Sequence, residues 1–238
     1  MRVAVFSDIH ANIHALDAVL ADIERQGVDR LICLGDLVGY GAFPNEVIAR
    51  IRERDIPTIM GNYDDGIGYE RNECGCAYKT EGERARGQES IAWTTQTVSP
   101  ENKAFLRRLP LKLELGVNGF RVAFVHGSPR RINEYLYEDR PLSSLEKVLD
   151  ASGADILVCG HTHLPYHRRI GARHVVNVGS VGKPKHGDPR ACYAVLGLNG
   201  GFSVEFRYGD YDFEAAAAAV ESVGLPGGFA SALRTGTP

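Results

Sequence analysis

The chain alternates short apolar runs with segments in which apolar residues recur at helical spacing. Residues 2–7 (RVAVFS) and 30–35 (RLICLG) have the length and composition of buried strands. Residues 12–26 and 44–55 instead carry apolar side chains every three or four positions, as amphipathic helices do. Residues 56–60 (IPTIM) favour a third strand. Strands alternating with helices predict a parallel sheet at the start of the chain.

The middle of the chain changes character. Residues 68–82 predict an irregular insert, and residues 83–108 predict two helices separated at Ser99 and Pro100. Two alternating runs then flank Asn118-Gly119, a dipeptide typical of a tight hairpin turn.

The second half predicts further strands, several of them antiparallel, between two helices. The expected helices are residues 142–153 and 212–224, and the expected strands are residues 155–160, 165–170, 174–180, 192–198 and 201–208. No internal repeat or linker interrupts the pattern, so we expect residues 1–238 to form a single domain.

Composition excludes several classes of protein. With 238 residues, 44% hydrophobic and 24% charged, the chain is typical of a globular domain, and its formal net charge of -3 does not support nucleic-acid binding. Five cysteines, an odd number, argue against a disulfide framework. The opening apolar run is too short for a signal peptide and no later run is long enough for a membrane span, so we expect a cytoplasmic protein.

Candidate chemistry gathers where the predicted strands end. Five strands are followed directly by a side chain that can bind a metal, and two of the loops supply another two residues later. These residues are Asp8, His10, Asp36, Asn62, His126, His161 and His163. Because ligands bind beyond the carboxyl ends of strands in α/β sheets, we expect these side chains to converge. Carboxylate, amide and imidazole donors suit manganese, iron or zinc, whereas the absence of thiolates argues against a structural zinc site.

The same segments resemble a known family. SDIH, GDLVGYG, GNYD, VHGSP and GHTH, from residue 7 to about residue 180, resemble the signature blocks of the calcineurin-like metallophosphoesterase superfamily. The closest likeness is to its small prokaryotic phosphodiesterases, including those related to diadenosine tetraphosphate hydrolases. The resemblance implies a mixed α/β fold, a four-layer α-β-β-α sandwich of two mixed sheets flanked by helices. It also implies two divalent metal ions, with manganese favoured and iron, zinc or nickel as alternatives.

The resemblance further implies how the ligands divide. One metal would lie between Asp8, His10, Asp36 and His163, and the other between Asp36, Asn62, His126 and His161. Asp36 would bridge the two ions, and a metal-bridging hydroxide would attack the phosphorus.

One block departs from the family pattern. The common version of GNYD has histidine in third place, where it is thought to protonate the leaving group while the acidic residue orients it. Here these positions are Tyr63 and Asp64, the candidate catalytic residues. A phenol with a pKa near 10 is a poorer acid than an imidazolium. Tyr63 therefore either donates a hydrogen bond during catalysis or packs against the insert.

Other polar residues are candidates for substrate binding. Asn12 either caps a helix or contacts phosphate, and Arg130 and Lys183 belong to basic clusters that either bind phosphate or form charged loops. Cys74 and Cys76 in the insert are expected to pack within the loop and not to bind metal, with a role in shaping the substrate pocket as the alternative.

These features together predict a binuclear phosphoesterase that acts on phosphodiester or phosphoanhydride bonds of a small, nucleotide-type substrate. The alternatives are a protein serine/threonine phosphatase or phosphomonoesterase, and a non-catalytic metal-binding scaffold or nucleotide-sensing module. A homo-oligomer is compatible with the sequence.

Overall fold

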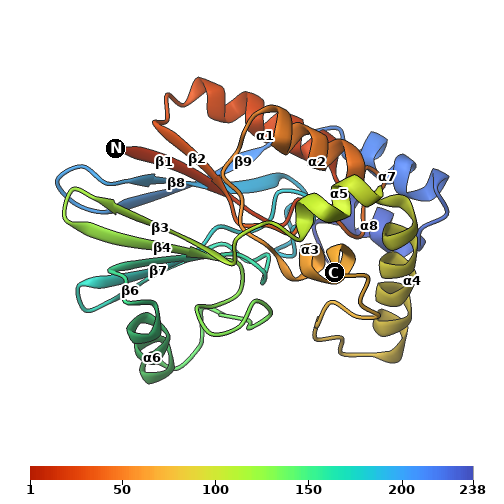
Figure 1. Ribbon diagram of the computed structural model, residues 1–238. Coiled ribbons are helices and arrows are strands. Elements are labelled where there is room, and N and C mark those ends of the chain that lie inside the picture. Colours follow the sequence, from red (N-terminus) through yellow and green to blue (C-terminus); the bar gives the residue numbers. More distant parts are fainter. Residues whose placement is uncertain (238) are drawn as a thin grey trace.

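Two mixed β-sheets pack face to face in the computed structural model, which describes residues 1–237 (Figure 1). The first sheet has the order β2-β1-β8-β9 and the second the order β3-β4-β5-β7-β6. The first contains β1 (Arg2–Phe6), β2 (Arg30–Cys33), β8 (Ala191–Gly197) and β9 (Ser203–Gly209). The second contains β3 (Lys112–Val117), β4 (Phe120–Val125), β5 (Ile156–Cys159), β6 (Tyr166–Ile170) and β7 (Arg173–Asn177).

Helices cover the outer faces of both sheets. In Figure 1, α1 (Ile13–Arg25) and α2 (Pro44–Glu53) cover the first sheet, and α6 (Leu142–Ser152) covers the second. The remaining helices gather at one end, namely α3 (Asn62–Gly68), α4 (Glu81–Thr97), α5 (Pro100–Leu106), α7 (Phe213–Ser222) and α8 (Gly227–Thr235). The predicted four-layer sandwich is confirmed. None of the described helices is both long and apolar enough to cross a membrane.

Successive side chains of β1 point alternately toward the second sheet and toward the helices, so this strand packs against both layers. Val3 and Val5 face the second sheet and pack in one core with Phe124, whereas Ala4 and Phe6 face the helices and belong to another. Each of these side chains is fully buried. Burying a valine or phenylalanine stabilises the fold by roughly 1.5–3 kcal/mol. Both faces of β1 are therefore packed, so the position of its carboxyl end is fixed.

The predicted strand at residues 56–60 is wrong. In the described chain this segment has one isolated bridge, from Thr58 to Cys33, and no ladder. Pro57 has no N–H to donate. The backbone N–H of Met60 donates to the carbonyl of Pro110 at 2.8 Å instead of to β2. The segment thus follows the edge of the first sheet briefly and then turns toward the other end of the molecule.

Two helices were not predicted. α3 begins at Asn62, because the Asp64 carboxylate accepts the free N–H of Gly61 at 2.9 Å and so caps the helix start. α8 begins at Gly227, directly after Pro226, although Pro226, Gly227 and Gly228 favour a turn in the sequence. The insert was predicted correctly, since residues 69–80 contain no helix or strand.

Candidate metal centre

The strand ends converge at one edge of the sandwich. Asp8 follows β1, Asp36 follows β2, His126 follows β4 and His161 follows β5, while Asn62 opens α3. All seven predicted ligands are buried. They form two neighbouring clusters, which we call the first and second clusters.

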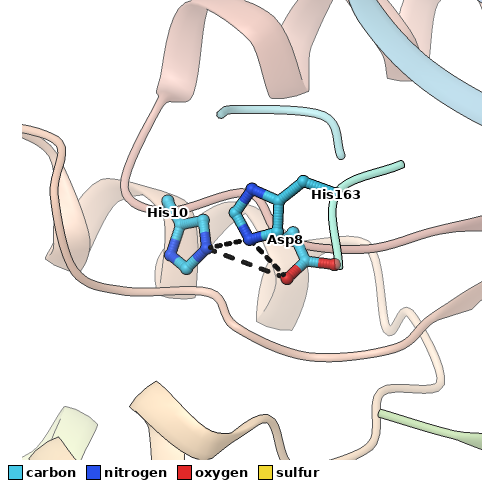
Figure 2. A group of neighbouring side chains, drawn as sticks. All are labelled: Asp8, His10 and His163. Carbon is cyan, nitrogen blue, oxygen red and sulfur yellow. Dashed lines mark hydrogen bonds and ion pairs between the residues drawn. The ribbon is translucent and has the colours of Figure 1, made fainter. Parts of the chain in front are cut away.

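The first cluster contains Asp8, His10 and His163, which offer ligand atoms within 4.8 Å of one another (Figure 2). The Nε2 atom of His163 lies 3.2 Å from Asp8 Oδ1, and that of His10 lies 3.8 Å from the same oxygen. The two Nε2 atoms are 3.2 Å apart. All three side chains therefore point toward one small volume.

The second cluster contains Asp36, His126 and His161, again with ligand atoms within 4.8 Å. Asn62 joins it, because its Oδ1 lies 2.9 Å from Nε2 of His126. Its Nδ2 donates to the carbonyl of Cys74 at 2.8 Å, so the insert orients the amide oxygen toward the cluster.

Asp36 lies between the clusters. Its Oδ2 is 3.4 Å from Nε2 of His126 and 3.6 Å from Nε2 of His10. Its Oδ1 accepts the backbone N–H of Tyr63 at 2.8 Å, which leaves Oδ2 directed at both groups. This is the arrangement that a shared ligand requires.

Backbone carbonyls set the tautomers of three histidines. The Nδ1 atoms of His10, His126 and His163 contact the carbonyls of Val38, Leu34 and Lys183 respectively. A carbonyl only accepts, so each Nδ1 carries a hydrogen, and in the neutral form of each ring Nε2 presents a lone pair to the centre. Metal-binding histidines are commonly oriented in this way.

Some buried polar atoms of the two clusters have no hydrogen-bond partner in the described chain, and a cation would satisfy them. The lone pairs of His10 and His163 face each other at 3.2 Å, where they repel unless a positive charge lies between them. Asp8 Oδ1 and His161 Nε2 are buried and have no hydrogen-bond partner among residues 1–237. An unsatisfied buried polar atom costs about 1–3 kcal/mol. Two divalent ions would satisfy these atoms, and the oxygen and nitrogen donors suit manganese, iron or zinc.

The pKa values indicate where positive charge is most favourable. Burial lowers the pKa of His126, but the charges and hydrogen bonds around the ring, with the charge of Asp36 first among them, together outweigh burial and raise this pKa to about 9. Burial, together with the charge of His126, lowers the pKa of His161 to about 3. Burial and then the charge of Lys185 lower the pKa of His163 to about 3. The centre attracts positive charge between its carboxylates while most of its imidazoles stay neutral, as metal ligands must be.

Five of the seven predicted ligands have left-handed backbone conformations. Their φ angles are 56° for Asp8, 48° for His10, 54° for Asp36, 65° for His161 and 63° for His163. Such a conformation costs a residue other than glycine about 1–3 kcal/mol. Hydrogen bonds between the loops hold it, including His10 N–H to the Asp36 carbonyl at 2.9 Å and His161 N–H to Asp8 Oδ2 at 3.0 Å. Backbone strain is therefore concentrated at this centre.

Asp64 fixes the loop that carries Asp36. Its carboxylate accepts the backbone N–H groups of Asp36 at 2.8 Å and of Leu37 at 2.9 Å, as well as that of Gly61. Gly61 is required at this approach, because a Cβ there would lie 2.1 Å from Asp36 Oδ1. The Asp64 side chain is fully buried. Its contacts support a positioning role through the backbone of Asp36 rather than contact with a substrate.

Tyr63 is almost fully buried beside the first cluster. Its ring lies 5.4 Å from that of His10 and 4.7 Å from that of Tyr40, measured between centroids. Its hydroxyl oxygen is 3.4 Å from that of Tyr78, which belongs to the insert. This contact supports packing against the insert, the second of the two roles considered for Tyr63. Direct action of the phenol on a substrate remains a prediction.

A cavity of about 700 Å³ opens above both clusters. Ligands from both clusters line it, and its walls carry aromatic and basic side chains, including Tyr135, Tyr137, Lys183 and Lys185. α8 closes one side, with Phe229 packed on Tyr40 at 5.1 Å between ring centroids. The tyrosines of residues 135–137 and the α8 wall were not predicted, because nothing in their local sequence marks them as neighbours of the strand ends.

The three predicted substrate-binding residues occupy different places. Lys183 lines the cavity. Asn12 accepts the backbone N–H of Ala15 at 3.1 Å and caps α1, and its amide donates to the Gly182 carbonyl at 3.2 Å. Arg130 forms an ion pair with Glu134 and is not among the residues that line the cavity.

The site thus offers two candidate metal positions that share one carboxylate, at the edge where the two packed sheets meet. Metal-dependent phosphoesterases use such an arrangement to activate water and to hold the phosphate. Comparison with known families agrees with that class. The calcineurin-like phosphoesterase superfamily domain matches residues 1–201, and the chain belongs to this superfamily. The resemblance seen in the sequence is confirmed.

Individual relatives span nearly the whole chain. Protein MJ0912 of Methanocaldococcus jannaschii is 33% identical over 94% of this chain and 93% of its own. The crystal structure of a metallophosphoesterase from Sphaerobacter thermophilus is 31% identical, covers 100% of this chain and 99% of its own, and superposes with a TM-score of 0.80. The phosphodiesterase YfcE of Escherichia coli is 24% identical over 82% of this chain and 87% of its own.

Proposed function

We propose that the protein hydrolyses phosphodiester or phosphoanhydride bonds of a small, nucleotide-type substrate with two divalent metal ions, manganese first among them. The single observation that carries this proposal is Asp36 Oδ2, which faces histidines of both clusters at 3.4 Å and 3.6 Å. The first ion would be held by Asp8, His10, Asp36 and His163, and the second by Asp36, Asn62, His126 and His161.

Bound at these positions, two ions would supply an activated water near neutral pH and neutralise charge on the phosphate. The protein's own groups prepare the site. Carbonyl hydrogen bonds keep the lone pairs of His10, His126 and His163 directed at the ions, and Asp64 keeps Asp36 between them. Water needs no serine or cysteine nucleophile in this scheme.

Leaving-group chemistry favours diesters and anhydrides over alkyl monoesters. Tyr63 replaces the histidine that is common at this position in the family. Burial raises the pKa of Tyr63 well above its usual value, so the phenol is a weak proton donor. Its hydroxyl lies by Tyr78 rather than free in the cavity. Substrates whose leaving group departs with little protonation are therefore the better match.

The experiment compares substrates on protein that has been stripped of metal and reloaded with manganese. We expect bis(p-nitrophenyl) phosphate to be hydrolysed faster than p-nitrophenyl phosphate, and both activities to disappear with the metal. His174→Ala is a matched control, because His174 pairs with His167 at the surface of the second sheet and should leave activity unchanged. Faster hydrolysis of the monoester would favour a phosphomonoesterase. Two bound ions with no hydrolysis of either ester or of a phosphoanhydride would favour a non-catalytic scaffold.

A further inference from the structure

Two lysines in the cavity wall have no partner for their charge. Lys183 and Lys185 are partly buried and line the cavity together with the ligands of both clusters. Among residues 1–237, neither ammonium group has a hydrogen-bond partner or a carboxylate within 4.0 Å, although Glu83 lines the same cavity. Holding two like charges close together and partly out of water is unfavourable, so a ligand that carries negative charge would stabilise both.

Other basic side chains differ from these lysines. Arg121 pairs with Asp155 at 3.2 Å and Arg173 pairs with Asp150 at 2.7 Å, although both pairs lie at the surface, where a partner contributes little. Lys183 and Lys185 are more buried than Arg121, yet they have no acidic partner. These two partly buried cations without an acidic partner thus lie at the cavity, where a substrate can reach them.

Lys183 lies beside the first cluster. Its Nζ is 4.8 Å from the centre of the Tyr40 ring, and that ring meets His10 edge-on at 4.9 Å between centroids. Its backbone carbonyl accepts the Nδ1 hydrogen of His163. Lys185 lines the same cavity as His161 and His163. Both lysines therefore lie in the wall of the cavity that the candidate metal ligands also line.

Aromatic side chains line the cavity beside both clusters. Tyr135 lies 4.0 Å from the ring of His161 between centroids, and Tyr137 stacks on Tyr135 at 5.6 Å with an interplanar angle of 8°. The second cluster thus has two tyrosines beside it, whereas the first has Tyr40 together with Lys183.

The loop that carries the lysines is held in place. The Ser180 hydroxyl accepts the N–H of Lys183 at 2.8 Å, and the N–H of Gly187 donates to the Gly236 carbonyl at 2.9 Å. Gly236 follows α8, which lies outside the part of the chain that the family domain matches, residues 1–201. The cationic wall is therefore supported by a segment beyond the common domain.

Charge balance separates two substrate classes. The carboxylates of Asp8 and Asp36, an attacking hydroxide and a singly charged phosphodiester together match the charge of two divalent ions. The wall carries four cations, Lys79, Arg86, Lys183 and Lys185. Only one further carboxylate among the described residues lines it, that of Glu83, so part of this positive charge would then remain without counter-charge. A second phosphate group next to the scissile one supplies it.

We propose that Lys183 and Lys185 form a second anion subsite that binds a phosphate group adjacent to the scissile phosphate. The subsite deepens the proposed function, on which it rests, because it selects phosphoanhydrides and other substrates with two neighbouring phosphates over plain monophosphate diesters. The tyrosines beside His161, Tyr135 and Tyr137, would then receive the group attached to the other side of the scissile phosphate.

The test measures binding of two stable probes to the manganese-loaded protein by calorimetry. Methylphosphonate carries one anionic group, and methylenediphosphonate carries two that cannot be hydrolysed apart. We expect the wild-type protein to bind the diphosphonate at least about tenfold more tightly, in keeping with charge pairs that are partly desolvated. Lys185→Met and Lys183→Met should each remove most of this preference and change methylphosphonate binding by less than about threefold. Metal content is measured after each titration, because a diphosphonate can also extract metal.

Lys147→Met is the matched control, since Lys147 is exposed on α6 and far from the cavity wall, and it should retain the full preference. Equal weakening of both probes in the two cavity variants would show that the lysines act on the scissile phosphate, and would overturn the subsite. An unchanged preference in both variants, or no preference in the wild-type protein, would also overturn it. If diester hydrolysis persists in that case, the proposed function stands. Selective binding of the diphosphonate without hydrolysis of any ester or phosphoanhydride would instead contradict the proposed function and leave the subsite supported.

Discussion

The floor and the walls of the cavity are built in opposite ways. Each floor ligand lies shortly after a strand or opens a helix, and each is buried. Hydrogen bonds to backbone groups orient six of the seven side chains, all except that of His161. The walls come from the insert, from residues 135–137, from the loop after Ser180 and from α8, and their charged groups at Lys183 and Lys185 are unpaired. The floor therefore determines the class of chemistry, which the superfamily shares, while the walls determine which phosphate compound reaches it.

The largest effect is expected at the floor, from Asp36→Asn. A neutral amide is a poor shared ligand for two cations, so hydrolysis should fall by about 10³-fold or more, equivalent to several kcal/mol of transition-state stabilisation. Elemental analysis should show lower metal occupancy at both positions. Asp150→Asn, at an exposed residue of α6, is the control and should leave activity intact. Wild-type occupancy by two metals in Asp36→Asn would disprove the shared-ligand assignment.

A smaller effect is expected from Asp64→Asn, which leaves every ligand in place. The amide still accepts a hydrogen bond but lacks the charge that three backbone N–H groups share in the wild type. Loss of an outer partner of this kind typically costs about 10–100-fold in metal affinity or activity. Activity measured against manganese concentration should show the loss partly recovered at high metal. A loss that no metal concentration recovers would mean that Asp64 acts on the reaction itself.

The smallest effect is expected from Tyr63→Phe, where floor and wall meet. The substitution removes the hydroxyl near Tyr78 and keeps the ring packed on His10 and Tyr40. We expect the rate of diester hydrolysis to fall by less than about tenfold with metal content unchanged, since general acids typically contribute more. A larger loss with both metals retained would show that the phenol contacts the substrate. Tyr63→His, the family residue, should raise alkyl monoester hydrolysis relative to aryl diester hydrolysis.

The contrast between floor and walls also explains which features could be predicted from the sequence. The fold and the grouping of the seven ligand residues could be predicted because strand ends in a sandwich converge, so polar residues at those ends must meet. Residues 56–60 were wrongly predicted as a strand. Their apolar composition does not reveal that the N–H of Met60 donates a hydrogen bond to the carbonyl of Pro110. Arg130 was predicted as a phosphate ligand because it belongs to a basic cluster. The sequence does not show that Arg130 forms an ion pair with Glu134, four residues later.

The residues that form the cavity walls could not be predicted from local sequence patterns. Tyr135 reaches the centre by stacking on His161, and Phe229 reaches it through Tyr40, contacts between residues that are far apart in the chain. Neither has a spacing or neighbour that distinguishes it from an ordinary core aromatic residue. Lys183 was identified from its place in a basic cluster, but its missing partner became visible only in three dimensions.

The carbonyl hydrogen bonds behind the imidazoles also give the centre a spectroscopic reporter. The Nδ1 protons of His10, His126 and His163 are buried and bonded to backbone oxygen, so they should exchange slowly with water and give resolved downfield signals in proton NMR. Substituting cobalt for the native ion would spread these signals further through the unpaired electrons of the metal. Loading of each position could then be followed separately, in solution, without a substrate.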